Sequence, residues 1–144
     1  MARSSVAPDY ALCMPRLRAL LTVAVIAAGA LAIPASAQAS WILQECRATE
    51  LRGAKICLYR DNADNNLAQG RYINNSSIDL ETNGVFKRRD RYQEIYCART
   101  VTRAGTTSRC TRRLARGTYY LLANTWRRDE FLFSTFTRDC RFGF

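Results

Sequence analysis

The 144-residue chain contains no histidine. Histidine is the usual general base beside a serine or cysteine nucleophile and the commonest protein ligand of metal ions. Its absence excludes Ser-His-Asp and Cys-His catalysis and argues against most catalytic metal sites. Cysteine does not replace it, because no two cysteines have the C-x-x-C spacing of a zinc site. We therefore expect a protein that is not an enzyme and has no cofactor and no bound metal.

Proline is confined to the first 34 residues, in a segment typical of a secretory signal peptide. Arg16 and Arg18 precede an apolar run from Ala19 to Ile33, and the small residues of Ala35–Ala37 follow it. This is the order of a positive region, an apolar region and a cleavage site. The apolar run has about 15 residues, whereas a membrane-spanning helix needs about 20. We interpret residues 1–37 as a cleaved signal peptide.

Two details of processing stay open. Cleavage is expected before Gln38, with Ser40 as the alternative first residue of the exported protein. Residues Met1–Cys13 are long and polar for a signal peptide, so Met14 is an alternative start. The exported protein is expected outside the cell or in the periplasm, without a transmembrane segment.

Residues 38–144 have the size of a single domain of about 107 residues. Removal of the signal peptide lowers the net charge from +10 to about +8, because Arg3, Arg16, Arg18 and Asp9 are lost with it. A chain this short buries only roughly two-thirds of the surface that is exposed when it is unfolded. Its folded state is therefore expected to need covalent crosslinks.

Five cysteines follow the signal peptide, and in an exported protein they are expected to be oxidised. Cys46 and Cys57 flank one turn candidate, and Cys97 and Cys110 flank another, so each pair is predicted to form a disulfide across a hairpin. Cys140 is then either a buried apolar residue or a link between chains. The competing connectivity joins Cys140 to Cys97 or Cys110.

Short apolar runs separated by Gly, Asn and Asp predict β-strands. The candidate strands are Ala54–Arg60, Gly70–Asn74, Ser77–Glu81, Val85–Arg88, Gln93–Val101, Thr107–Leu114, Thr118–Ala123 and Glu130–Thr137. Asn83-Gly84 is the clearest turn signal, because both residues tolerate the positive φ of a type I′ hairpin. Only Ser40–Leu51 shows an apolar spacing that fits a short helix. The expected fold is all-β, a small antiparallel β-sandwich or barrel stabilised by disulfides.

Two short stretches resemble a known family. Leu114–Leu122 contains Gly-Thr-Tyr-Tyr, and Leu58–Asp61 reads Leu-Tyr before an acidic turn. Both resemble the bacterial pre-peptidase C-terminal domains and related jelly-roll modules. The resemblance implies a secreted β-sandwich and gives no residue a functional role.

The acidic residues offer few enzymatic or metal sites. Asp79 and Glu81 would lie on one face of a strand, and Asp129-Glu130 stands at the start of another, but alternating acids usually form the solvated face of a strand. The Asp-rich and Asn-rich loop Asp61–Asn66 departs from the calcium-binding EF-hand pattern. Local hydrogen bonding explains such loops without a metal.

Arginine is the strongest positive signal, with seventeen arginines against two lysines after residue 37. A guanidinium binds phosphate, sulfate or carboxylate through two parallel hydrogen bonds. The competing interpretation is that arginine is simply the soluble cation of this chain. The candidate anion-binding residues are Lys87, Arg88, Arg89, Arg91, Arg109, Arg112, Arg113, Arg116, Arg127 and Arg128.

The sequence thus favours a secreted, basic binding module for an acidic partner. That partner could be a polyanionic glycan, a cell-wall polymer, an anionic membrane surface or a nucleic acid. One alternative is a secreted inhibitor or toxin-like effector that inserts a rigid loop into a protein target. Another is a small hydrolase that uses two carboxylates.

Overall fold

The computed structural model describes residues 40–144, and the predicted signal peptide and its cleavage sites lie outside the described residues. The described chain consists of strands joined by turns and loops, without a helix. Its strands are β1 (Trp41–Ala48), β2 (Ala54–Asp61), β3 (Leu67–Asn74), β4 (Leu80–Arg88), β5 (Glu94–Tyr96), β6 (Thr100–Thr102), β7 (Thr106–Arg113), β8 (Gly117–Arg127), β9 (Glu130–Phe136) and β10 (Cys140–Phe142). Accordingly, no helix in this part of the protein could cross a membrane.

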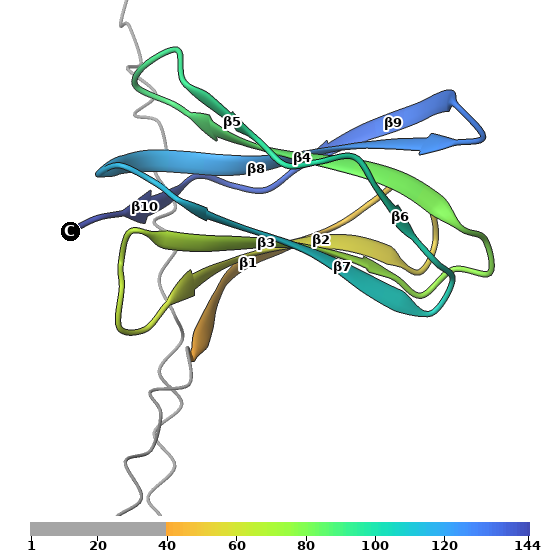
Figure 1. Cartoon of the computed structure of the whole chain (residues 1–144), viewed down its shortest axis with the longest axis horizontal. Helices are drawn as coiled ribbons and strands as arrows, with labels where there is room; N and C mark the ends of the chain where they lie inside the picture. Colours follow the sequence, from red (N-terminus) through yellow and green to blue (C-terminus); the bar gives the residue numbers. More distant parts are fainter. Residues whose placement is uncertain (1–39) are drawn as a thin grey trace, which may run out of the picture.

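The strands form two antiparallel sheets that face each other (Figure 1). The first sheet has the order β1-β2-β3-β7. The second has the order β10-β8-β4-β5, with β9 also beside β8 and β6 also beside β4. This arrangement confirms the predicted all-β, antiparallel fold.

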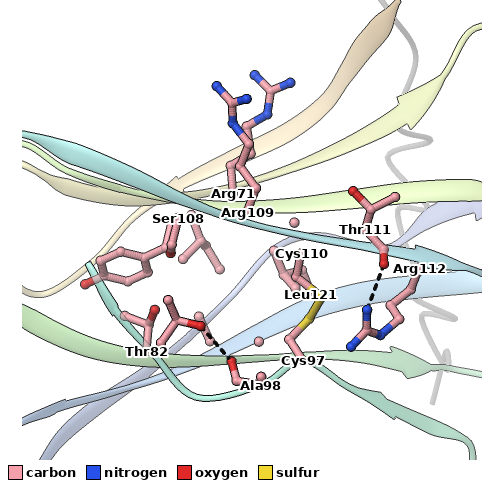
Figure 2. A pocket seen from close by; sticks show the side chains of 16 residues that line it. Arg71, Thr82, Cys97, Ala98, Ser108, Arg109, Cys110, Thr111, Arg112 and Leu121 are labelled. Carbon is pink, nitrogen blue, oxygen red and sulfur yellow. Dashed lines mark hydrogen bonds between the residues drawn. A yellow bond between two sulfur atoms is a disulfide. The ribbon is translucent and has the colours of Figure 1, made fainter. Parts of the chain in front are cut away.

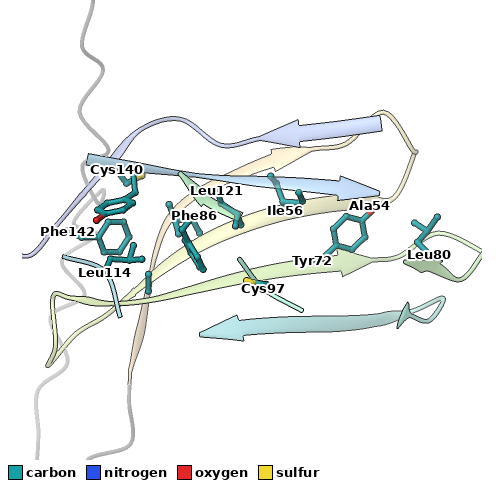
Figure 3. Close-up of a cluster of buried hydrophobic side chains, with 14 residues drawn as sticks. Ala54, Ile56, Tyr72, Leu80, Phe86, Cys97, Leu114, Leu121, Cys140 and Phe142 are labelled. Carbon is teal, nitrogen blue, oxygen red and sulfur yellow. The ribbon is translucent and has the colours of Figure 1, made fainter. Parts of the chain in front are cut away.

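Alternate side chains of both sheets fill the space between them. In β8, residues 119, 121, 123 and 125 are buried and the intervening residues are more exposed, as expected for a strand with one face on the core. Ile56 and Leu58 of the first sheet and Phe86 and Leu121 of the second belong to one apolar cluster (Figure 3). This core leaves the outer faces of the two sheets available for other uses.

Both predicted disulfides are present, but they have different roles. Cys46 and Cys57 lie directly opposite each other on β1 and β2, with Cα atoms 4.1 Å apart. Cys97 follows β5 in the second sheet and Cys110 lies on β7 in the first, so their bridge connects the two sheets and not the arms of a hairpin. Neither of the bridges among the described residues includes Cys140, which is buried in β10.

The predicted hairpin turn at Asn83-Gly84 is wrong, because both residues lie inside the continuous strand β4. Gly84 faces the interior, where its missing side chain leaves room for the disulfide of Cys97. The backbone N–H of Cys97 also donates to the Gly84 carbonyl, at 2.8 Å. Glycine here serves close approach between the sheets and not a turn.

One helix prediction and one other strand prediction need correction. The segment Ser40–Leu51 contains β1 and not a helix, and a bulge between Leu43 and Glu45 disturbs the apolar alternation there. The predicted strand Gln93–Val101 is divided into β5 and β6, which both pair with β4. The interruption lies where Cys97 joins Cys110.

Candidate functional site

The structure distributes the ten predicted anion-binding residues over three regions. Lys87, Arg88, Arg89 and Arg91 belong to the β4–β5 hairpin; Arg109, Arg112, Arg113 and Arg116 to β7 and the segment after it; and Arg127 and Arg128 to the β8–β9 turn. The three regions differ in how many of these charges already have an acidic partner.

In the β4–β5 hairpin the cations are largely neutralised by nearby acids. Lys87 Nζ lies 2.6 Å from Glu94, and Arg89 Nε lies 3.0 Å from Asp139. The Lys87 ammonium holds the pKa of Glu94 below its usual range, and that of Lys87 rises correspondingly. These two cations contribute little free positive charge to a partner.

Arg88 is part of the internal structure. Its side chain is only 10% exposed and its Nε lies 2.7 Å from Asp90. A second guanidinium nitrogen donates to the Arg116 carbonyl at 2.8 Å, and the group packs over the Tyr119 ring. Asp90 raises the pKa of Arg88 through their hydrogen bond, and its own pKa is lowered. Arg88 thus fixes the hairpin to the connection between β7 and β8.

Strand β7 sends its arginines to opposite sides of the sheet. Arg112 points inward at the open edge between the sheets, where its Nε donates to the Tyr96 carbonyl of the second sheet at 3.2 Å. Arg109 and Arg113 are exposed on the outer face. Sequence clustering alone therefore grouped side chains that the strand separates.

The outer face of the first sheet carries a pair of adjacent arginines. Arg71 on β3 lies directly opposite Arg109 on β7. Figure 2 shows both side chains next to each other and directed away from the cavity between the sheets. Arg113 lies four residues further along the same face of β7. We call Arg71, Arg109 and Arg113 the arginine face.

Two side chains of the arginine face have partners within the described protein and one does not. Arg71 stacks over the Tyr59 ring at 4.0 Å and donates from Nε to Gln69 at 2.5 Å. Arg113 is paired with Asp64 at 2.7 Å, although its side chain remains mostly exposed. Arg109 has no ionic or hydrogen-bonding partner among residues 40–144. One guanidinium is thus held in place and the next is available.

Sequence reasoning missed Arg71. It stands alone in the sequence and not in a cluster, and only the register of β3 against β7 brings it beside Arg109. The only signal for Arg71 in the sequence was the alternation of β3, which puts its side chain on the outer face of the sheet.

A second arginine group lies at one end of the sandwich. Arg91 and Arg116 border a cleft of about 420 Å³ together with Arg141 of β10, which was not predicted. Asp90 also lines this cleft, and Arg88 neutralises it there. The cleft gathers only some of the predicted residues, and it is separate from the arginine face.

Arg127 and Arg128 lie beside acids. They line a hollow of about 470 Å³ with Asp79 and Glu81. Asp79 accepts a hydrogen bond from the Ala104 backbone N–H at 2.9 Å, and Glu81 pairs with Arg99 at 2.7 Å. Both predicted carboxylates therefore have structural partners.

The loop considered for calcium is also internally bonded. One Asp61 carboxylate oxygen accepts the backbone N–H groups of Ala63 and Asp64, each at 2.8 Å. Asp64 accepts the Asn66 N–H and pairs with Arg113. This is the local hydrogen bonding typical of Asx turns. Residues 40–144 contain no cluster of three or more potential metal ligands from His, Cys, Asp or Glu.

A cavity of about 230 Å³ lies between the sheets next to the Cys97–Cys110 bridge (Figure 2). Apolar residues such as Ile56 and Leu121 line it together with hydroxyl groups of Thr82 and Ser108. Within the described chain its lining includes no carboxylate. The cavity thus lacks the acid and base groups that hydrolysis by two carboxylates requires.

No protein family model, curated protein or solved structure matches this chain. The resemblance to pre-peptidase C-terminal domains therefore stays a prediction.

Proposed function

We propose that this protein is an exported, non-enzymatic module that binds an acidic polymer on the arginine face. The proposal rests on one observation, the placement of Arg109 directly opposite Arg71. Like charges opposite each other on neighbouring strands destabilise a sheet. An anionic group bound between them would remove this repulsion and accept hydrogen bonds from both guanidinium groups.

A polymer fits this face better than a small anion does. Arg109 and Arg113 are four residues apart on one strand, which corresponds to about 13 Å. A chain with repeating phosphate, sulfate or carboxylate groups could contact both positions at once. Tyr59 holds Arg71 in place, so little side-chain entropy would be lost when that contact forms.

The exported location is supported by the two disulfides, since disulfides persist in oxidising compartments. It remains part of the proposal.

The test is the salt dependence of binding to double-stranded DNA and to heparin. Arg71→Gln/Arg109→Gln should weaken binding to both and reduce the slope of log K against log[salt] for DNA by about 2, because each lost phosphate contact removes about 0.9. The matched control is Arg52→Gln/Arg103→Gln, which removes the same charge from exposed loop positions. Equal weakening by the two double variants would reduce the effect to net charge and contradict the proposal.

A second candidate, an inhibitor that presents a rigid loop, has one observation in its favour. Tyr92 in the β4–β5 loop is 97% exposed, and the ion pair of Arg88 with Asp90 braces that loop. A complex anchored by an aromatic side chain would persist in high salt, whereas polyanion binding would not. A partner captured at high salt and lost with Tyr92→Ala would favour this second function.

A further inference from the structure

The outer face of the second sheet differs from the arginine face in its chemistry. One row across its strands is apolar and contains Tyr96 of β5, Val85 of β4, Leu122 of β8 and Phe136 of β9. The rings at the two ends of this row are the most exposed, with Tyr96 at 58% and Phe136 at 55%. Val85 is buried between them, so the accessible apolar surface of this row is formed mainly by the two rings. Exposed apolar surface that is not scattered singly marks an interaction site.

A second row with aromatic residues lies further along the same strands. Trp126 of β8 packs edge-on against Phe131 of β9, with ring centroids 5.9 Å apart, and Val101 of β6 lies beyond Glu81 of β4. Phe131 is 53% exposed. Leu122 and Trp126 are four residues apart on β8, so the two rows are separated by about 13 Å.

Polar side chains occupy the strip between these rows. Asn83, Asn124 and Ser134 lie opposite one another on β4, β8 and β9. The Asn83 amide donates to the Cys97 carbonyl, and Asn124 accepts from Ser134 at 2.6 Å. These bonds use the Asn83 N–H group and the Asn124 oxygen. The Asn83 oxygen and the Asn124 N–H groups remain for a ligand.

The charges on this face neutralise one another. Lys87 pairs with Glu94, and Glu81 pairs with Arg99, which also stacks over the Trp126 ring at 4.7 Å. A domain with a net charge of about +8 thus has one face on which these cations are paired. That charge balance suits an uncharged partner and gives no advantage to a nucleic acid, which needs available cations.

We propose that this face, which we call the aromatic face and define as Tyr96, Phe136, Phe131, Trp126, Asn83 and Asn124, binds a neutral polysaccharide. The faces of aromatic rings carry partial negative charge and attract the C–H groups on the flat side of a sugar ring. The amides between the rows supply a hydrogen-bond donor and an acceptor for hydroxyl groups. Phe131 is the more open ring of the second row, because Arg99 stacks over Trp126. Rows this far apart contact different sugars of one chain and not a single sugar.

The experiment measures depletion of the protein from solution by insoluble cellulose, curdlan, mannan and chitin. Protein expressed from the full-length sequence is used in 0.5 M NaCl, about the range in which charge interactions beyond a few ångströms are screened. We expect at least one polysaccharide to bind it. Tyr96→Ala/Phe136→Ala should weaken that binding at least about tenfold, a loss of about 1.4 kcal/mol.

Tyr92→Ala/Phe144→Ala is the matched control, because it removes one tyrosine and one phenylalanine that are exposed elsewhere. It should bind as the unsubstituted protein does, and circular dichroism should show both double variants folded. Arg71→Gln/Arg109→Gln should also bind unchanged, so this proposal and the acidic-polymer proposal fail separately.

Three results would overturn the aromatic-face proposal. One is no binding to any of the four polysaccharides, and another is equal loss in the control variant. The third is a concentration-dependent dimer in sedimentation velocity that Tyr96→Ala/Phe136→Ala abolishes, since a second copy of the chain would then cover this face.

Discussion

A Cβ atom added to Gly84 would lie 3.3 Å from the Sγ of Cys97, a sulfur atom held by its bond to Cys110. This distance is tighter than nine in ten real contacts of a Cβ atom, so the neighbour would have to move by a few tenths of an ångström. The disulfide restricts that movement, because it is anchored in both sheets. Gly84 therefore acts as a spacer that lets the bridge cross the core.

We expect Gly84→Ala to lower the free energy of unfolding by about 1–3 kcal/mol, as overpacked cores do. Urea denaturation monitored by circular dichroism measures it. The control is the same substitution in a Cys97→Ala/Cys110→Ala background, where the obstructing sulfur is gone and the loss should shrink. An identical loss in both backgrounds would show that Gly84 matters for another reason.

A glycine in place of Asp129 in the β8–β9 turn should stabilise the folded protein. Arg128 and Asp129 have φ values of 50° and 65°, a conformation that costs a non-glycine residue about 1–2 kcal/mol. Asp tolerates this conformation better than most residues, so Asp129→Gly should raise the melting temperature only slightly. The ion pair of Asp129 with Arg99 is highly exposed, so its loss offsets little of this gain.

Thermal melts of Asp129→Gly and Asp129→Ala separate the two effects. The alanine variant loses the same ion pair and keeps the strained backbone, so it should be no more stable than the unsubstituted protein. A glycine variant that melts no higher than the alanine variant would contradict the strain argument.

Acid should destabilise the β4–β5 hairpin. Lys87 lowers the pKa of Glu94 in the folded protein, so this pair stabilises the fold above the ordinary glutamate pKa of about 4.3. Its contribution is lost as the pH falls through the lowered value, because the folded state then also takes up the proton. Urea midpoints between about pH 5 and pH 3 should fall, and they should fall less steeply in Glu94→Gln.

Arg88 and Arg109 should respond oppositely to the same substitution. Arg88→Gln removes the bonds to Asp90 and to the Arg116 carbonyl and should lower the melting temperature. Arg109→Gln removes an exposed charge opposite Arg71 and should leave the melting temperature equal or slightly higher. If both variants melt alike, the internal role assigned to Arg88 is wrong.

Local patterns in the sequence were enough for strands such as β8 and for the geometry of one disulfide. The alternation of Thr118–Ala123 and the short spacing of Cys46 and Cys57 depend on residues close in the chain, and both predictions agree with the structure. Asn83-Gly84 misled because the local preference for a turn competes with packing between the sheets. That packing involves Cys97, which no local pattern reveals.

The candidate site was harder to predict because it depends on register. The sequence shows how many arginines there are, but it does not show which residues lie opposite them on the neighbouring strands. Arg71 becomes relevant only through its pairing with Arg109, and Arg88 becomes internal only through a contact with the Arg116 carbonyl. Both relationships join segments that are distant in the chain.

The bulge between Leu43 and Glu45 has a consequence for colloidal behaviour. β1 is an outer strand of the first sheet, and such strands offer unpaired backbone groups to other molecules. Proline often prevents such strands from pairing with other chains, but no proline follows residue 34. In β1 the bulge interrupts the row of backbone donors and acceptors instead. At the other edge of this sheet, the charges of Arg109 and Arg113 repel the β7 strand of a second molecule. Each edge of the second sheet is divided between two strands, β5 with β6 and β9 with β10, so neither edge offers one continuous row of backbone groups to another molecule.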